Sequence, residues 1–252
     1  MNLTGNTIFI TGGGSGIGRG LAEALHKKGN KVIISGRRKG HLEATVQANH
    51  GIDSIELDIA DPASIDAVAK ELIARYPDLN VLINNAGIMQ IDDVSTNVDD
   101  QLISSTITTN LMGPIRMTGA LIEQLKRQQS ATVFVVSSVL GFVPMAMAAV
   151  YSSTKAALHS YTQSLRYKLR NTSVKVQEIV PPWVQTDSLN SNEERRAMPL
   201  KDFIDETIIA LGTEADEVLV ERAKPLRNNA GQGEGAFVVR FNELFESGQA
   251  AS

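Results

Sequence analysis

The sequence predicts an α/β fold: a doubly wound parallel β-sheet with helices on both faces, in three α/β/α layers. Strand-like apolar runs alternate with helical stretches, which is typical of a parallel sheet covered on both sides. The runs lie at 7–11, 31–35, 54–58, 80–84, 132–137 and 174–180. The 252 residues contain no Pro/Gly/Ser-rich linker and no internal repeat. We therefore expect a single domain over 1–252.

The first element is a buried strand at 7–11 that leads into a glycine-rich loop and a helix at 19–28. Bare glycine backbone lets a pyrophosphate approach closely, and the unpaired N–H groups of a helix N-terminus attract its charge. This order predicts a Rossmann-type dinucleotide site, although a tight turn without a ligand would show the same glycines. The expected contacts are Gly12, Ser15, Gly16, Ile17 and Gly18.

The second strand ends in Gly36, Arg37 and Arg38, near the position where such folds read the adenosine ribose. An acidic residue there would accept hydrogen bonds from a free 2'-hydroxyl, whereas an arginine pairs with a 2'-phosphate. Arg37 therefore favours NADP(H), with NAD(H) as the other option. The alternative is a pair of solvated loop charges, because the glycine loop has Ser15 where a second basic residue would add support.

Tyr151 and Lys155 lie four residues apart in a predicted helix, so the phenol and the ammonium share one helix face. A tyrosine titrates near 10, but an adjacent cation lowers the pKa of the phenol. Tyr151 could then exchange a proton with an alcohol or a carbonyl near neutral pH. The spacing alone is weak evidence, because it recurs by chance in lysine-rich helices.

Together with further motifs, these residues resemble the short-chain dehydrogenase/reductase family in its compact, single-domain branch. The matching segments are Thr11-Gly12-x-x-x-Gly16-x-Gly18, Asp58-Ile59, Asn84-Asn85-Ala86-Gly87, Asn110, Ser138 and Tyr151-x-x-x-Lys155. Each motif is modest alone, but their conjunction in the family's order is specific. The resemblance covers about 6–186.

The resemblance implies hydride transfer between a nicotinamide and a secondary alcohol or its carbonyl. It implies a catalytic tetrad of Asn110, Ser138, Tyr151 and Lys155. Tyr151 would exchange the proton, Ser138 would stabilise the same oxygen, Lys155 would also hold the nicotinamide ribose, and Asn110 would position a water. The other implied cofactor contacts are Asp58 and Ile59 at the adenine, Asn85, Ala86 and Gly87 after the fourth strand, Tyr151, and Val184 and Thr186 at the carboxamide.

The chain departs from the family pattern in its last third. Pro182 stands where the family has glycine, and because proline fixes φ and lacks an N–H, we expect a stiffer loop with Trp183 over the pocket. The usual last strand is not apparent, and 217–220 is its expected substitute. The tail, with a helix predicted at 237–245, resembles a bacterial subgroup called DltE-like. We expect a substrate lid at about 185–215 and a C-terminal extension at about 216–252.

Composition excludes several function classes. A net charge of −4 without a basic stripe argues against nucleic acid as a partner, and no apolar run is long enough for a membrane span. The chain has no cysteine and only scattered histidines, of which His159 reads as an ordinary helix residue, so no metal site is expected. Asp92, Asp93, Asp99 and Asp100 read as solvated charges. Without a secretory signal, the cytoplasm is the expected location.

We expect an NADP(H)-dependent oxidoreductase acting on a small to medium, largely apolar carbonyl compound, with Met145, Met147, Trp183 and Leu189 among the lining candidates. The alternative is a non-catalytic NADP(H)-binding sensor or interaction protein of the same fold. Apolar faces on helices expected at about 99–127 and up to about 170 exceed what one sheet-facing stripe needs. Similar proteins pair these helices across a two-fold axis, so we expect a homodimer, with a tetramer as a further step.

Overall fold

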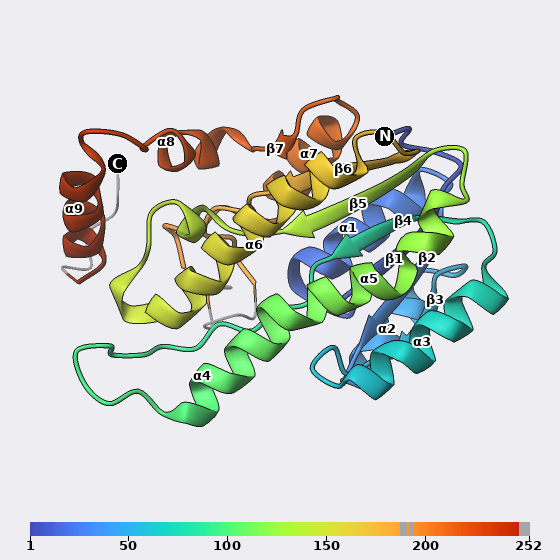
Figure 1. Cartoon of the computed structure of the whole chain (residues 1–252), viewed down its shortest axis with the longest axis horizontal. Helices are drawn as coiled ribbons and strands as arrows, with labels where there is room; N and C mark the ends of the chain where they lie inside the picture. The colour runs from blue at the N-terminus through green and yellow to red at the C-terminus, as the bar shows by residue number, and fades with distance from the viewer. Residues whose placement is uncertain (187–190, 192–193, 247–252) are drawn as a thin grey trace.

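The computed structural model describes residues 1–186, 191 and 194–246, which form a seven-stranded parallel sheet in the order β3-β2-β1-β4-β5-β6-β7 (Figure 1). The strands are β1 (Thr7–Thr11), β2 (Lys31–Gly36), β3 (Asp53–Glu56), β4 (Leu79–Asn84), β5 (Ala131–Val136), β6 (Val174–Ile179) and β7 (Glu217–Val218). The predicted doubly wound architecture is confirmed. The strand order reverses between β1 and β4, and ligands of such sheets bind outside the carboxyl ends of the strands at that point.

Helices cover both faces of the sheet. The helices are α1 (Gly16–Lys27), α2 (Lys39–Ala48), α3 (Pro62–Arg75), α4 (Asp100–Ile107), α5 (Gly113–Lys126), α6 (Ala149–Leu169), α7 (Leu200–Leu211), α8 (Lys224–Arg227) and α9 (Glu234–Glu246). Helix α1 packs against α7 on one face and α3 packs against α5 on the other, beside α6. Ile8 and Ile10 of β1 belong to the first core and Phe9 to the second, which follows from the alternation of side chains along a strand.

The helix expected at about 99–127 is interrupted. A π-helical segment at Thr108–Met112 separates α4 from α5, and Asn110 lies within it. Such insertions are frequent at functional sites, because they re-aim one side chain without ending the helix. Pro114 follows at the start of α5, where its missing N–H is tolerated.

The C-terminal extension begins with a short edge strand. Strand β7 pairs Glu217 with Glu178 and Val218 with Ile179 of β6, so the expected substitute strand exists but is shorter than 217–220. The chain then passes through α8 to α9, which lies at the end of the molecule toward which the arrowheads of β4 and β5 point (Figure 1). Within the described residues, no helix combines the length and the apolar character that crossing a membrane requires.

Candidate active site

A cavity of about 1650 Å³ opens at the carboxyl ends of the strands. Its lining comes from the loops after β1 to β6, and from α6, α8 and α9. Most of the expected site residues line it together: Gly12, Ser15, Gly16, Ile17, Gly18, Arg37, Ile59, Asn85, Ala86, Gly87, Ser138, Tyr151, Lys155, Val184 and Thr186. Asp58 and Asn110 do not line it.

The glycine loop is tied to the loop after β4. The Thr11 hydroxyl accepts hydrogen bonds from the backbone N–H groups of Asn85 and Ala86, both at 3.0 Å. The Asn85 amide donates back to the Thr11 carbonyl at 3.0 Å. Gly12 has φ +69°, and a Cβ on Gly18 would lie 2.2 Å from the Gly12 carbonyl oxygen. These glycines therefore let α1 approach β1 and leave the bare backbone that a pyrophosphate needs.

Arg38 reaches across the cavity mouth to the glycine loop. Its guanidinium donates to the Ser15 hydroxyl at 2.9 Å, and Arg37 and His41 line the same end of the cavity. The glycine loop has Ser15 where a second basic residue would add support for NADP(H). In the folded protein, Arg38 brings a second cation to this position. Among the described residues, the acidic side chain in the lining is that of Glu221, which follows β7.

Asp58 lies between two residues that line the cavity. Leu57 and Ile59 line the cavity on either side of it, whereas the Asp58 carboxylate accepts a hydrogen bond from the backbone N–H of Ala60 at 3.0 Å. Its backbone N–H donates to the Ser64 hydroxyl at 3.1 Å. The carboxylate thus stabilises the turn before α3, and its contact with the adenine stays a prediction.

Tyr151 and Lys155 lie on α6, where Lys155 is buried and Tyr151 is partly buried beside the cavity. The Lys155 ammonium donates to the Val136 carbonyl at 2.8 Å and lies 5.5 Å from the centre of the Tyr151 ring. Burial lowers the pKa of Lys155 to about 8, against the opposing charge of Glu178. Burial also raises the pKa of Tyr151 to about 12, against hydrogen bonding with the Ser138 side chain.

The expectation that Lys155 brings the pKa of Tyr151 toward neutrality is therefore wrong for the protein by itself. Burial of the phenol is the largest effect on its pKa. The phenol is held in its protonated form, which is the form that can give a proton to a carbonyl oxygen.

Ser138 caps a short helical turn, Val139–Gly141, and faces the cavity. Its hydroxyl oxygen accepts from the backbone N–H of Leu140 at 3.1 Å. A hydroxyl that accepts from backbone still has a proton to donate. Capping therefore aims the Ser138 proton at the space beside the Tyr151 phenol.

Asn110 acts on the cavity through the backbone. Its side chain donates to the Ile88 carbonyl and accepts from the Ile88 N–H, both at 2.8 Å, and it is fully buried. Ile88 itself lines the cavity. Asn110 thus fixes the loop after β4, and the π-helical turn is what aims the amide there.

Asp92 is a correction to the sequence analysis, which took it for a solvated charge. It is buried, and its carboxylate accepts from the N–H groups of Ala149 and Val150 at 3.1 and 3.0 Å. These are unpaired donors in the first turn of α6, and a negative charge also suits the helix dipole there. Asp92 therefore caps the helix that carries Tyr151 and Lys155.

The far wall of the cavity is aromatic and comes from the tail. Phe237, Phe241 and Phe245 of α9 line it with Trp183; the Trp183 and Phe245 rings lie 5.4 Å apart. Asn242 fixes α9 to the loop after Ser138, accepting from Ala146 N–H at 2.6 Å and donating to the Pro144 carbonyl at 3.1 Å. The sequence analysis predicted this helix but not its role. The sequence signal for this role is the four-residue spacing of three phenylalanines, which places them on one face of the helix.

The loop after β6 closes over the glycine loop despite Pro182. Gln185 N–H donates to the Met198 carbonyl and Met198 N–H to the Trp183 carbonyl, both at 2.8 Å. Thr186 packs against Gly16, on which a Cβ would lie 3.4 Å from the threonine methyl. Leu189, named from the sequence as a lining candidate, falls in 187–190, which with 192–193 and 247–252 lies outside the described residues.

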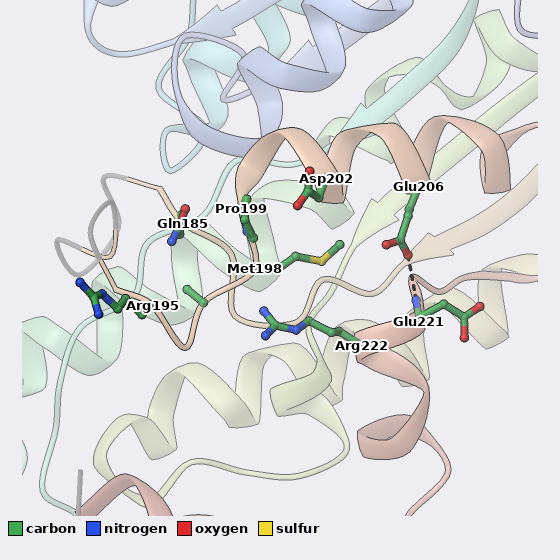
Figure 2. Close-up of a pocket in the computed structure, with 9 residues that line it drawn as sticks. Gln185, Arg195, Met198, Pro199, Asp202, Glu206, Glu221 and Arg222 are labelled. Carbon is green, nitrogen blue, oxygen red and sulfur yellow. Dashed lines mark hydrogen bonds between the residues drawn. The ribbon is translucent and has the colours of Figure 1, made fainter. Parts of the chain in front are cut away.

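A second hollow of about 450 Å³ lies at the start of α7 (Figure 2). Carboxylates and guanidinium groups share its lining, which includes Arg195, Asp202, Glu206 and Arg222. Glu206 accepts from the backbone N–H of Glu221 at 3.0 Å, the dashed line in Figure 2. The lining of this second hollow contains none of the expected catalytic residues, so we place the active site in the larger cavity.

Fold and site together define a dinucleotide-binding α/β protein with a Ser-Tyr-Lys constellation at the switch point of its sheet. The family described as "short chain dehydrogenase" matches residues 6–197. The chain belongs to this family and is an oxidoreductase that uses NAD(P).

Relatives extend the likeness over the whole chain. The uncharacterised oxidoreductase DltE of Bacillus subtilis (strain 168) is 35% identical over 98% of this chain and 97% of its own. The uncharacterised oxidoreductase SA2266 of Staphylococcus aureus (strain N315) is 30% identical over 83% of this chain and 92% of its own length. The DltE-like resemblance is confirmed.

Solved structures share the fold. A short chain dehydrogenase from Burkholderia cenocepacia J2315 in complex with NADP has a TM-score of 0.84 and 26% identity, over 95% of this chain and 98% of that one. A short chain dehydrogenase/reductase from Burkholderia phymatum in complex with NAD has a TM-score of 0.82 and 21% identity, over 100% of this chain and 98% of that one.

Proposed function

We propose that the protein is an NADP(H)-dependent oxidoreductase that moves a hydride between nicotinamide and a secondary alcohol or its carbonyl. The observation that carries the proposal is that Ser138, Tyr151 and Lys155 line the same cavity as the glycine loop. The residues present fit the cofactor, because the bare backbone of Gly12, Gly14, Gly16 and Gly18 at the start of α1 lines one end of the cavity of about 1650 Å³. When bound, the nicotinamide supplies or accepts the hydride.

The protein groups move the proton. In reduction, Tyr151 gives its proton to the carbonyl oxygen, and the raised pKa of the phenol keeps that proton available. Ser138 donates to the same oxygen and stabilises the charge that develops on it. Lys155 holds the ribose hydroxyls beside the phenol, and its ammonium charge stabilises the phenolate that remains.

Preference for NADP(H) is supported by the charge at the adenosine end. Arg37, Arg38 and His41 line that end, and Arg38 is already held at the glycine loop by Ser15. A guanidinium pairs with a 2'-phosphate through charge-assisted hydrogen bonds. Solved structures of this fold carry NADP in one case and NAD in another, so the preference rests on the two arginines.

The end of the cavity opposite the arginines favours a largely apolar substrate. Met145, Met147, Trp183 and the phenylalanines of α9 form its wall, and pockets of this composition bind apolar bodies around a few polar groups. A small to medium carbonyl compound fits between this wall and Tyr151. The absence of cysteine agrees with a reducing compartment such as the cytoplasm.

Replacement of the proton donor tests the function. Tyr151→Phe keeps ring packing and removes the transferable proton, so we expect kcat to fall about a hundredfold or more while NADPH affinity changes little. Turnover is measured on a panel of diketones, aldehydes and secondary alcohols. Tyr161→Phe is the matched control, because Tyr161 lies on the same helix and does not line the cavity.

The outcomes separate the two functions considered. Near wild-type turnover in Tyr151→Phe would contradict the mechanism. If the wild-type protein binds NADPH tightly but transfers no hydride to any member of the panel, the sensor function replaces the enzyme.

A further inference from the structure

The turn that carries Ser138 packs directly on the catalytic helix. This serine turn, residues 138–142, begins at the Ser138 cap and contains the short helix Val139–Gly141. A Cβ on Gly141 would lie 2.9 Å from the backbone carbonyl carbon of Lys155. The serine turn and α6 therefore touch backbone to backbone, and a rotation of the turn would move the Ser138 hydroxyl relative to the side chains of α6 that line the cavity.

Phe142 ends the serine turn, and its ring is held from two sides. The His159 ring of α6 meets it at 71°, with the ring centres 4.6 Å apart. The central guanidinium carbon of Arg227 on α8 lies over the Phe142 ring, 4.4 Å from its centre. A cation in this position is attracted by the negative face of the ring. Phe142 does not line the cavity, so these contacts fix the turn from behind.

The sheet fixes both groups that hold Phe142. Nδ1 of His159 lies 2.7 Å from Oε2 of Glu178 on β6, a fully buried carboxylate. Arg227 donates to both oxygens of Glu217 on β7, at 2.6 and 2.8 Å. A two-point pair of this kind sets the direction of a guanidinium as well as its distance. The Phe142 ring is thus placed by contacts that lead back to two neighbouring strands.

The same side chains could also be considered as metal ligands. His159, Glu178 and Glu217 offer three ligand atoms within 4.8 Å of one another. Arg227 already bonds both oxygens of Glu217, and a metal ion would have to displace it. The contacts therefore favour an arginine that holds Phe142 over a metal centre.

Arg227 belongs to the C-terminal extension, where the chain departs from the family pattern. Pro225 and Leu226, the two residues before it, line the cavity, whereas Arg227 does not. Helix α8 therefore contributes to the cavity wall with one part and holds the serine turn from behind with another. Asn242 of α9 bonds the backbone just after this turn. The extension thus contacts the segment between Ser138 and α6 at two separate points.

We propose that Arg227, fixed by Glu217, is a positioning residue that aims Ser138 at the reacting oxygen through the Phe142 ring. Its consequence for turnover rests on the proposed function, in which Ser138 donates to that oxygen. Without Arg227, the Phe142 ring is held only from the His159 side. The serine turn then samples a wider range of orientations, and the Ser138 proton is aligned for a smaller share of the time.

A double-mutant cycle tests whether Arg227 acts through Ser138. Arg227→Gln and Ser138→Ala are made singly and together, and kcat, KM and the NADPH dissociation constant are measured. Arg227→Lys keeps a cation near the ring but loses the two-point pair with Glu217. Lys224→Gln is the matched control, because Lys224 lies on the same helix, pairs with the exposed Glu221 and does not line the cavity.

We expect Arg227→Gln to lower kcat about tenfold with little change in NADPH affinity, and Arg227→Lys to recover part of this loss. In the Ser138→Ala protein, the same Arg227→Gln change should alter kcat less than about twofold, because the group that it positions is gone. Lys224→Gln should behave like wild type. An equal loss of kcat with and without Ser138 would overturn the proposal, since a merely structural arginine acts in both backgrounds.

A second measurement needs neither substrate nor cofactor. The Leu140 N–H donates to the Ser138 hydroxyl at 3.1 Å, so its hydrogen exchange, followed by NMR, reports the order of the serine turn. We expect its protection to fall about fivefold or more in Arg227→Gln, while the amides of β5 keep theirs.

Unchanged protection of Leu140 in Arg227→Gln would overturn the proposal. If Leu140 responds as expected but the wild-type protein transfers no hydride, the proposed function fails and the role of Arg227 in holding the turn stands. If Arg227→Gln does not fold, Phe142→Leu removes the ring through which Arg227 acts, and the same two measurements decide.

Discussion

At the scale of single residues, the cofactor end shows how one contact changes an interpretation. Arg38 looked like a loop charge, yet its hydrogen bond to Ser15 holds a second guanidinium beside Arg37. The two arginines approach the expected 2'-phosphate position from one end of β2.

We therefore expect Arg37→Asp to shift preference toward NADH, because it removes one cation and adds repulsion. Arg38→Ala should weaken NADPH binding about tenfold or more, the loss expected for a charged hydrogen bond, with little effect on NADH. Dissociation constants for both cofactors measure this. Lys39→Ala is the control, since Lys39 adjoins Arg38 but does not line the cavity. If the ratio of the NADPH and NADH dissociation constants is unchanged in both variants, these arginines are only solvated loop charges.

The burial of Lys155 makes the stability of the protein depend on pH. Its pKa of about 8 in the folded protein is below the ordinary 10.5, so the unfolded chain binds more protons between these values. The contribution of Lys155 to the free energy of unfolding therefore rises with pH across this window and is lost as pH falls through 8. The full difference is about 3 kcal/mol.

Lys155→Met should accordingly be inactive but more stable than wild type at pH 7, and this advantage should shrink by about 1 kcal/mol or more by pH 9.5. Denaturant unfolding at the two pH values measures it. A variant less stable than wild type at pH 7 would show that the ammonium carries no burial penalty.

At the scale of elements, the catalytic helix begins with a cap that is distant in sequence. The N-cap residue of α6, Ala148, makes no side-chain cap hydrogen bond, and Asp92 supplies the missing acceptors from the loop after β4. Tyr151 lies in this first part of α6, so the cap also sets where the phenol points.

Asp92→Ala should cost about 1–2 kcal/mol of stability, as lost caps do, and should lower kcat because the first turn of α6 frays. Thermal unfolding and turnover are measured together. Asp93→Ala is the matched control, because Asp93 is exposed and bonds only the Ser95 side chain and nearby backbone. Equal behaviour of the two variants would mean that α6 does not depend on the Asp92 cap.

At the scale of the whole molecule, α4 and α5 follow one another along one line with α6 beside them (Figure 1), and they leave large apolar side chains in solvent. Ile107, Met112 and Ile115 are 37, 37 and 36% exposed. Leu121 and Leu125, also on α5, are fully buried in the core beneath it. The exposed residues support the proposed two-fold interface, since closed pairing is the commonest solution for such a surface.

We expect light scattering at micromolar concentration to give twice the chain mass of 27.2 kDa. Ile115→Asp should shift the protein to the monomer, because a charge in an apolar interface loses its hydration. Ile209→Asp is the control on the opposite face, where Ile209 is 74% exposed. A wild-type mass near 27.2 kDa under conditions that preserve activity would reject the interface.

The sequence by itself determined the fold, because apolar periodicity and glycine spacing are local signals that report burial and backbone geometry directly. It also placed Gly12 to Gly18, Ser138, Tyr151 and Lys155 in one site. Tertiary structure decided what depends on distant contacts. Asp92 reaches α6, Arg38 reaches Ser15, α9 reaches the pocket, and Glu178 meets His159 only after the sheet forms. The pKa of Tyr151 rises rather than falls because burial is a property of the packed molecule, which no spacing along the chain records.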